Sequence, residues 1–236
     1  MKIALIGYGK MGKTLERVAV SRGHEIVLKI DVNNPQDFDK LRAADVAIEF
    51  TRPESAVSNL EKCIAAGVPV VCGTTGWLAE YERISALCKA RKTGFFYASN
   101  YSIGVNIFFE INRRLADMMN GYDMYDVSME EIHHTQKLDA PSGTAITLAE
   151  GIFDHLPRKT NWVCNTEGSP SDLTITAKRI DPAPGTHIVR YDSPIDSIEI
   201  THTAHSREGF ATGAVVAAEW LFGKKGVFSM KDLLGF

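Results

Sequence analysis

The residues best suited to chemistry lie together between positions 130 and 145, in the run EEIHHTQKLDAPSGTA. The run holds neighbouring imidazoles at His133 and His134, an ammonium at Lys137, and a Pro-Ser-Gly-Thr sequence that predicts the start of a helix. The first backbone N–H groups of a helix have no intrahelical partner, so Gly143 and Thr144 are candidate anion ligands. Because histidine can donate a proton near neutral pH, the run could hold a carboxylated substrate and protonate it. Solvated His and Lys side chains before a capped surface helix would give the same pattern.

A strand predicted over residues 126–133 would place the two neighbouring histidines in different surroundings. Side chains alternate between the two faces of a strand, so His133 and His134 should point in opposite directions. One can then act as a proton donor, while the other supports the loop or touches the edge of the substrate. No third Cys or His lies at a useful spacing, so we expect no metal site. His202 and His205, farther along the chain, are expected to be structural or solvated.

A second pattern, in the first forty residues, is typical of dinucleotide binding. An apolar strand at residues 2–6 leads into GYGKMG and then into a helical stretch, and a strand at residues 25–30 ends in an acidic residue. In this setting the glycines allow close approach of a pyrophosphate, the helix N-terminus faces the phosphates, and the acid binds the adenosine ribose. The candidate cofactor ligands from this pattern are Gly7, Tyr8, Gly9, Lys10, Met11, Gly12 and Asp31.

Strands and helices continue to alternate up to about residue 102, which predicts an open parallel sheet with right-handed crossovers. Further strands are expected at residues 46–50, 68–72 and 93–98, and helices at residues 54–66 and 77–91. Ligands bind such sheets at the carboxyl ends of the strands. The loops after the first, second, fourth and fifth strands, including residues 73–75 and 98–102, should therefore share one crevice.

Beyond residue 102 the pattern predicts a second domain of the α+β class, with a mostly antiparallel or mixed sheet. Apolar residues at helical spacing predict a helix over residues 104–119. Strands are expected at residues 126–133, 173–179, 187–191 and 198–204. Residues 157–172 and 181–186, rich in Pro, Gly, Ser and Asp, are expected to be loops. A helix rich in Ala should follow at residues 209–222.

Composition is that of a soluble enzyme with a real core. The 236 residues suffice for one large or two modest domains, and 44% of them are hydrophobic. The net charge of −3 gives no reason to expect nucleic acid or a membrane surface as a partner. No apolar run approaches the ~20 residues that span a bilayer, and the N-terminal strand leaves no room for a signal peptide. The cysteines form no C-x-x-C pair, so buried free thiols in a reducing cytosol are expected at Cys63, Cys72, Cys88 and Cys164.

The chain resembles the dihydrodipicolinate reductase family, also called the 4-hydroxy-tetrahydrodipicolinate reductases. The most specific part is HHTQKLDAPSGT, which follows the family pattern H-H-x-x-K-x-D-A-P-S-G-T. The resemblance extends, in order, to GYGKMG, FTRP, CGTTG, ASNYSIGVN, and SR followed by FA, and thus covers the chain from end to end. The loops between residues 31 and 50, on the adenosine side, are compact for this family.

The resemblance implies a role for each matching residue. His133 matches the proton donor, Lys137 matches a residue that holds substrate and assists catalysis, and His134 matches a substrate contact. Gly143 and Thr144 match a cradle for a carboxylate. The contacts on the nicotinamide side of the cofactor are matched by Gly73, Thr74, Thr75, Ala98, Ser99, Asn100 and Tyr101.

The family also implies a reaction and an assembly. It implies a cytoplasmic homotetramer that uses NADH or NADPH to reduce a small dicarboxylate, with loss of water, in the diaminopimelate route of lysine biosynthesis. The expected Rossmann-like cofactor domain is discontinuous, with residues 1–102 and 208–236. Residues 103–207 should form the domain for substrate binding and tetramerisation.

Other classes of protein make different demands on these residues. Another two-domain nicotinamide-dependent amino-acid or semialdehyde dehydrogenase would need a nucleophilic Cys or a different acid–base set, and Cys72 is the candidate nucleophile. A non-enzymatic nucleotide sensor would have no use for the His-His-Lys string, and a scaffold protein would act through its sheet alone. Loss of reduced-nicotinamide absorbance with fresh substrate separates all of these classes.

Overall fold

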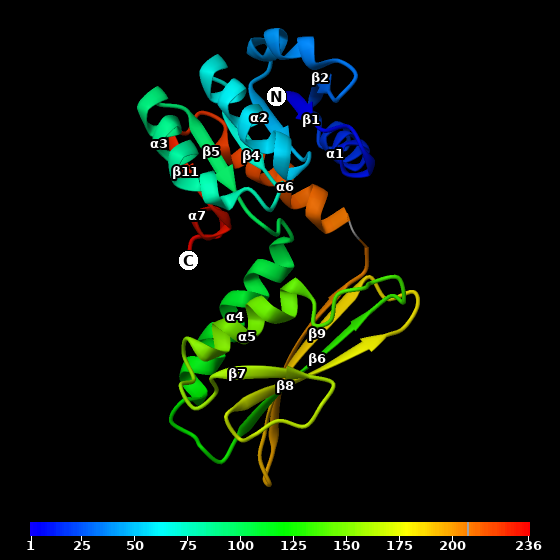
Figure 1. The fold of residues 1–236 in the computed structure, drawn as a ribbon, viewed down its shortest axis with the longest axis vertical. Coiled ribbons are helices and arrows are strands. Elements are labelled where there is room, and N and C mark those ends of the chain that lie inside the picture. Colours follow the sequence, from blue (N-terminus) through cyan, green and yellow to red (C-terminus); the bar gives the residue numbers. More distant parts are fainter. Residues whose placement is uncertain (207) are drawn as a thin grey trace. The chain divides into compact units, whose positions relative to one another are not determined.

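The structure is a computed structural model that describes residues 1–206 and 208–236. The chain divides into two compact units (Figure 1). The first contains residues 1–106 and 208–236, and the second is the intervening segment. The division falls within helix α4 (Ile103–Met119). Arg207, which carries part of the family resemblance, lies outside the described residues.

The first unit is a doubly wound α/β fold. Its six-stranded sheet has the order β11-β5-β4-β3-β1-β2, and every neighbouring pair is parallel. The strands are β1 (Lys2–Ile6), β2 (Glu25–Ile30), β3 (Val46–Glu49), β4 (Val70–Cys72), β5 (Gly94–Tyr97) and β11 (Gly226–Phe228). The helices are α1 (Lys10–Ser21), α2 (Pro53–Ala66), α3 (Tyr81–Arg91), α6 (Glu208–Leu221) and α7 (Met230–Leu234), with 3-10 helices at Pro35–Ala43 and Leu78–Glu80.

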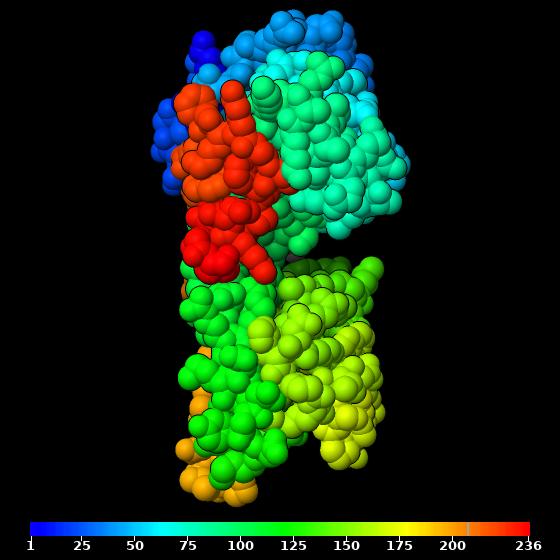
Figure 2. Space-filling model, turned by 90° about the vertical axis from the view of Figure 1, so that its left-hand side faces the viewer, coloured from blue at the N-terminus to red at the C-terminus, as the bar shows by residue number. Residues whose placement is uncertain are grey.

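Helices cover both faces of this sheet, because parallel strands are apolar on both sides. On one face α1 and α6 supply Leu15, Val215 and Leu221 to the core. On the other face α2 and α3 supply Leu60 and Ile84. Helix α6 thus lies against α1 and β3, which come early in the chain, as the orange atoms beside the blue ones show (Figure 2). Strand β11 pairs with β5, and α7 contacts α6 and β11.

The second unit has a mixed five-stranded sheet in the order β10-β9-β6-β8-β7. Strand β6 pairs antiparallel with β9 and parallel with β8. The bounds are β6 (Asp126–His133), β7 (Asn161–Cys164), β8 (Asp172–Arg179), β9 (Gly185–Asp192), β10 (Ser197–Ala204) and α5 (Gly143–Phe153). Phe108 of α4 and Leu148 of α5 join Val127, Ile175 and Val189 of the sheet in one core cluster. The helix-covered face of this sheet is the face that carries the candidate active site.

The predicted fold class is confirmed, with a parallel sheet in one unit and a mixed sheet in the other. The expectation that residues 157–172 form a loop is wrong, because Asn161–Cys164 pairs with β8 as a short edge strand. The sequence pattern also fails to predict β11, which is three residues long and begins with a glycine.

The cysteines are nearly as expected. All four are free thiols, and Cys63, Cys72 and Cys88 are buried. Cys164 is only half-buried, because it lies in the edge strand β7. Within residues 1–206 and 208–236, no helix combines the length and the apolar character that crossing a membrane requires.

Candidate active site

Strand β6 carries His133 at its carboxyl end. Burial alternates along this strand, so Val127, Met129, Glu131 and His133 share the face that the helices cover. His133 is 7% exposed. His134, the next residue, is half-buried and follows the end of the strand. The two histidines therefore differ in their surroundings.

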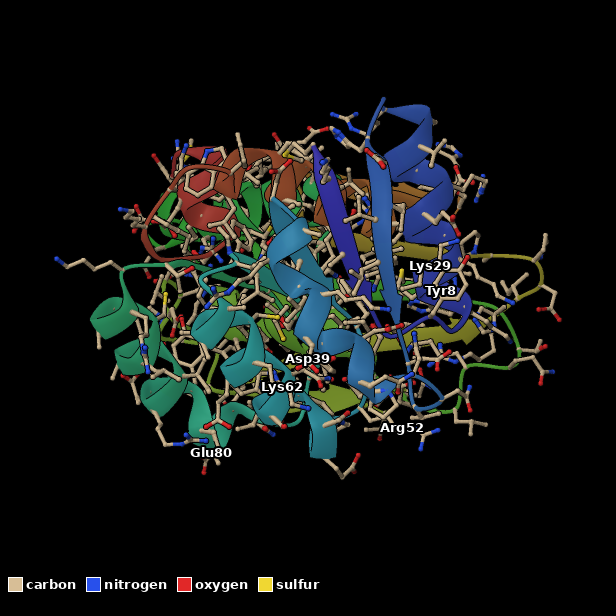
Figure 3. The ribbon with its side chains drawn as sticks, turned by 90° about the horizontal axis from the view of Figure 1, so that it is seen from above. Tyr8, Lys29, Asp39, Arg52, Lys62 and Glu80 are labelled. Atoms are coloured by element: carbon tan, nitrogen blue, oxygen red, sulfur yellow. The ribbon has the colours of Figure 1, made fainter. Side chains whose placement is uncertain are left out.

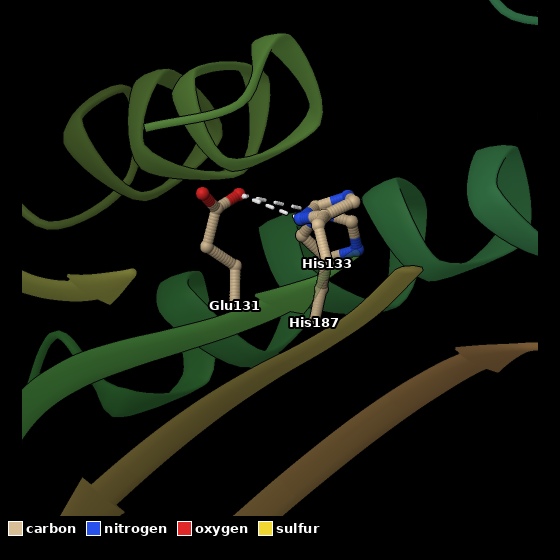
Figure 4. Close-up of side chains that lie close together, drawn as sticks. All are labelled: Glu131, His133 and His187. Atoms are coloured by element: carbon tan, nitrogen blue, oxygen red, sulfur yellow. Dashed lines mark ion pairs between the residues drawn. The ribbon is translucent and has the colours of Figure 1, made fainter. Parts of the chain in front are cut away.

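Two residues that the sequence reasoning did not single out lie beside His133 (Figure 4). In the β6–β9 pairing Glu131 stands opposite His187. Oε2 of Glu131 lies 3.6 Å from Nδ1 of His133 and 3.8 Å from Nε2 of His187. The two imidazole rings lie edge to face, with centroids 5.1 Å apart. The donor candidate is thus one of two imidazoles that face the same carboxylate.

Glu131 is 0% exposed and is held from two further directions. The backbone N–H of Ser142 donates to both carboxylate oxygens, at 3.2 and 3.1 Å. The guanidinium of Arg179 donates to Oε1 at 3.1 Å. Burial of a carboxylate is costly unless hydrogen bonds and an opposite charge compensate for lost hydration, and these contacts do so.

The expectation of no metal rested on spacing along the sequence, and the structure brings together groups that this spacing does not reveal. Ligand atoms of one carboxylate and two imidazoles, those of Glu131, His133 and His187, lie within 4.8 Å of one another. Spacing along the sequence could not show this, since β9 brings His187 from over fifty residues away. Binding of a metal cation is nevertheless disfavoured, because the positive guanidinium of Arg179 already pairs with the carboxylate of Glu131.

Burial sets the protonation of both imidazoles. It lowers the pKa of His133 below the usual histidine value, while the charge of Glu131 acts in the opposite direction. His187 is more enclosed, and burial lowers its pKa to about 4. His187 is therefore neutral at physiological pH, and a proton entering this pair goes to His133.

The loop after β6 carries Lys137. Its ammonium binds both carboxylate oxygens of Asp139 at 2.8 Å, and this contact lowers the pKa of the Asp139 carboxyl. Arg179 donates to the backbone carbonyls of Lys137 and Asp139, at 3.2 and 2.6 Å, as well as to Glu131. The guanidinium of Arg179 thus connects the loop that carries Lys137 to strand β6, which carries Glu131 and His133. A substrate carboxylate that binds Lys137 must share the ammonium with Asp139.

Helix α5 begins at Gly143, as the Pro-Ser-Gly-Thr sequence predicts. Ser142 is the N-cap, and its hydroxyl oxygen accepts from the backbone N–H of Ala145 at 3.2 Å. The N–H groups of Gly143 and Thr144 occupy the first two positions of the helix, where the helix itself offers no acceptor. Because Ser142 also binds Glu131, the helix N-terminus is fixed beside the histidine cluster.

In the first unit, the GYGKMG turn joins β1 to α1. Gly7 has a φ of +94°, and a Cβ there would lie 2.0 Å from the carbonyl oxygen of Phe50. A Cβ on Gly12 would lie 2.3 Å from the oxygen of Gly7, which explains the close packing of α1 on the turn. Gly9 instead faces open space. The turn thus has the shape that lets a pyrophosphate approach the backbone.

A cavity of about 510 Å³ opens beside this turn. Gly7, Tyr8, Gly9 and Asp31 contribute to its lining, so the loops after the first and second strands meet there as expected, whereas residues 73–75 after the fourth strand line a different hollow. Tyr8 donates a hydrogen bond to Glu16, and the ammonium of Lys29 lies 4.9 Å from the centre of its ring (Figure 3).

Other residues of the same cavity come from α2 and the loop before it. They include two cations, Arg52 and Lys62, which the sequence reasoning did not place there. Lys62 lies 4.2 Å from the ring centre of Phe38, which also lines the cavity.

The remaining cofactor candidates divide into two groups. Met11, Gly73, Thr74 and Thr75 line a second hollow, of about 230 Å³, together with residues 50, 51 and 53. Tyr101 instead packs in the core, 2% exposed, and its hydroxyl donates to the carbonyl of Cys72 at 2.6 Å. Its ring is therefore a structural element of the loop. Of its neighbours, Ala98 is buried, while Ser99 is exposed and Asn100 half-exposed.

Cys72 has none of the properties of a nucleophile. It is fully buried at the end of β4. Burial, together with the neighbouring Glu49, raises the pKa of its thiol well above the usual value. A reactive cysteine needs the opposite environment, one that stabilises the thiolate. The semialdehyde dehydrogenase alternative therefore loses its candidate nucleophile.

The signal for one overlooked residue was present in the sequence. Glu131 precedes His133 by two positions, so strand alternation already places the two on one face. His187 and Arg179 carry no such signal, because only the pairing of β9 and β8 with β6 brings them close. His202 stacks near Phe108, with centroids 5.9 Å apart, which agrees with a structural role, and His205 is exposed.

Comparison with known proteins agrees with this architecture. The family model for "Dihydrodipicolinate reductase, N-terminus" matches residues 1–101, and that for "Dihydrodipicolinate reductase, C-terminus" matches residues 104–234. The 4-hydroxy-tetrahydrodipicolinate reductase of Christiangramia forsetii is 51% identical over 99% of this chain and 98% of its own length. The reductase of the same name from Neisseria gonorrhoeae is 35% identical over 100% of this chain and 97% of its own.

A solved structure shares the fold. The dipicolinate-bound dihydrodipicolinate reductase from Paenisporosarcina sp. TG-14 superposes with a TM-score of 0.79 at 21% identity, covering 98% of each chain. With both family models matched in order and a full-length relative at 51% identity, the chain belongs to the dihydrodipicolinate reductase family.

Proposed function

We propose that this protein reduces the ring of 4-hydroxy-tetrahydrodipicolinate to tetrahydrodipicolinate, with loss of water, at the expense of NADH or NADPH. Membership of a reductase family makes it a nicotinamide-dependent oxidoreductase. The observation that carries the more specific proposal is the arrangement in the second unit. There a buried imidazole, an ammonium and the N-terminus of α5 are held together by Glu131 and Arg179.

The groups of the second unit fit a small dicarboxylate. The ammonium of Lys137 and the N–H groups of Gly143 and Thr144 are two cationic or dipolar ligands for carboxylate oxygens. A solved relative has dipicolinate bound, which is such a molecule. His134 follows the donor strand and is proposed as a further substrate contact. Holding the substrate in a fixed orientation is itself a large part of catalysis.

The proposed chemistry divides the work between cofactor and protein. When bound, reduced nicotinamide supplies the hydride, which goes to C4 of the unsaturated ring left after the 4-hydroxyl has departed as water. Negative charge then develops in the ring and is neutralised by a proton from His133. Lys137 and the start of α5 orient the substrate through a carboxylate. The proposed catalytic residues are therefore His133 and Lys137.

The first unit is proposed as the cofactor domain. Its open turn at Gly9 and the cavity lined by Asp31 fit a dinucleotide, with the carboxylate of Asp31 accepting hydrogen bonds from the adenosine ribose. The proposed ligands in and beside this turn are Gly7, Tyr8, Gly9, Lys10, Met11 and Gly12. Those on the nicotinamide side are Gly73, Thr74, Thr75, Ala98, Ser99, Asn100 and Tyr101, the last through its backbone.

We expect NADH to be used at least as well as NADPH. The charge of Asp31 should repel a 2′-phosphate, and the following residues, Val32 and Asn33, carry no positive charge. The measurement is kcat/KM for each cofactor at saturating substrate. A value for NADPH ten times that for NADH would contradict this interpretation.

The variant Lys62→Ala tests how the positive charges of the cavity affect the choice between NADH and NADPH. Lys62 and Arg52 line the same cavity as Asp31, and their positive charges partly offset the repulsion of a 2′-phosphate by Asp31, which is why NADPH should still be accepted. The substitution should lower kcat/KM with NADPH by severalfold and leave the NADH value nearly unchanged, because only the former cofactor brings an additional anion.

The second unit is proposed to form a homotetramer through its sheet. Its helix-free face offers polar side chains, including Glu130, Arg190 and Glu199, beside the half-buried Ile188. Light scattering coupled to size exclusion should give four times the 26.0 kDa chain mass, and a monomer would contradict the proposal. A cytoplasmic location, where the reduced cofactors are found, follows from the proposed reaction.

The direct test of the function is an absorbance assay for oxidation of NADH with freshly prepared substrate. Turnover with this substrate, and none with aspartate semialdehyde or an amino acid, would support the proposal. Binding of NADH without turnover would instead favour a nucleotide sensor.

A further inference from the structure

Glu131 is a buried carboxylate at the centre of the His133 site, and the proposed reaction gives it no role. It lies two residues before His133 on the same face of β6. Ser142 and Arg179 hold its carboxylate in place, at 3.1–3.2 Å. A carboxylate that is so firmly placed and charge-compensated can orient a neighbouring imidazole.

The imidazole of His133 lacks a partner on the side that faces this carboxylate. Its Nδ1 atom is buried and makes no hydrogen bond with any of the described residues. Oε2 of Glu131 lies 3.6 Å from it, a distance longer than a hydrogen bond. Catalytic hydrogen bonds are often long in unliganded enzymes and shorten when substrate binds. The ring edge opposite Nδ1 lies against Gly185, where an added Cβ would be 3.1 Å from Nε2.

On the basis of the proposed role of His133 as proton donor, we propose that Glu131 is the positioning residue for this donor. Its carboxylate accepts the Nδ1–H of His133, which fixes the ring and leaves the Nε2 proton for the substrate. During transfer the Nε2–H bond breaks, a C–H bond forms on the substrate ring, and the electron pair of the broken bond stays on nitrogen. The neutral imidazole keeps its Nδ1 proton and regains the other from solvent.

The other charged groups near His133 oppose its protonation. Lys137 and His134 act from the loop after β6, and Arg179 acts from β8. Together with burial they lower the pKa of His133, and Glu131 is the group that raises it. Removing the charge of Glu131 should therefore make the imidazolium harder to form.

The second imidazole does not compete for this proton. His187 lies 3.8 Å from the same carboxylate oxygen. Its deeper burial, with His133 and His202 adding smaller effects of the same sign, keeps its pKa near 4. Its Nε2 atom is 3.2 Å from the hydroxyl of Ser142, and this contact holds the uncharged ring in place at the edge of the site.

The test compares Glu131→Gln with Glu130→Gln. Glu130 is the adjacent residue of β6, points to the opposite face and binds Lys178 at 2.7 Å, so it controls for loss of one carboxylate from this strand. Two quantities are measured: the pH dependence of kcat with saturating NADH, and the titration of His133 followed by NMR of labelled histidine without substrate. The second readout does not depend on turnover.

Glu131→Gln should lower the pKa of His133 by about one unit, since an opposite charge at this distance typically shifts a pKa by about 1–3 units. A donor is active while protonated, so the basic limb of kcat should move to lower pH, and kcat above the limb should fall about tenfold. KM for NADH should stay the same. Glu130→Gln should change neither the limb nor the titration.

An unchanged His133 titration, with kcat lowered equally at every pH, would overturn the proposal and leave Glu131 a purely structural role. If Glu131→Gln does not fold, Glu131→Asp is used instead, because it keeps the negative charge but moves it farther from His133. That variant should then show a smaller shift in the same direction, and a shift in the opposite direction would also overturn the proposal. The two proposals can fail separately. Normal turnover by His133→Gln would show that His133 is not the proton donor. Impaired turnover by His133→Gln, together with normal turnover and normal His133 titration in Glu131→Gln, would reject only the role of Glu131.

Discussion

Replacing His133 with glutamine should lower kcat by about 10²–10⁴-fold, the usual contribution of a general acid. Glutamine fills much of the same space and still forms hydrogen bonds, but it cannot release a proton to the substrate. KM should rise only modestly. Because the donor acts in its protonated form, its contribution is present below its pKa and lost as pH rises through that value. The basic limb that belongs to this group should therefore disappear from the kcat profile of the variant.

His134→Gln is the matched comparison for that experiment. His134 follows the end of the strand and is half-buried, and we expect it to act mainly through KM while the shape of the pH profile is kept. Both variants are measured from pH 5 to 9 with saturating NADH. A flattened profile for His134→Gln and a normal one for His133→Gln would mean that the two roles are exchanged.

Lys137→Ala should lower kcat/KM for the substrate by about one to two decades, because a charge-assisted hydrogen bond is worth roughly 1.5–3 kcal/mol. Affinity for NADH should be almost unchanged, since Lys137 belongs to the second unit and the cofactor cavity is built within the first. Steady-state kinetics give the first quantity, and fluorescence titration with NADH gives the second.

Lys178→Ala controls for the loss of one ammonium from the second unit. Its side chain pairs with Glu130 on the helix-free face of the sheet, at 2.7 Å, so kcat/KM should stay within about twofold of the unaltered protein. Loss of NADH binding by Lys137→Ala, with substrate affinity kept, would contradict the assignment of Lys137 to the substrate.

Features set by local sequence were predicted well. The alternation from Asp126 to His133 predicts β6 with its observed bounds, and the Pro-Ser-Gly-Thr sequence predicts the start of α5 at Gly143. Both signals act over a few residues, through side-chain alternation and helix capping. The strands β7 and β11 carry no such signal. The equally short β4 belongs to an apolar run, whereas β11 begins with a glycine and β7 lies within a segment rich in Pro, Gly, Ser and Asp.

The candidate site was predicted only in part, for a related reason. His133, Lys137 and Gly143 come from one continuous segment, whereas His187 and Arg179 reach it through strand pairing. Strand register depends on how two distant segments fit, and one strand alone does not specify its partner. The sequence accordingly predicts a donor and an anion cradle, while the contacts of Glu131 with His133, His187 and Arg179 become visible only in three dimensions.

The late position of α6 along the chain affects how the protein can fold as it is synthesised. One face of the parallel sheet is completed by Ala214, Val215 and Leu221, which the ribosome makes only after the whole second unit. A nascent chain that ends before α6 therefore exposes apolar strands such as β1 and β3 on that face, while the second unit already has all its own strands. Domains generally fold as units during synthesis. The inserted unit should thus reach its native state first, and the unit that was started earlier should finish last.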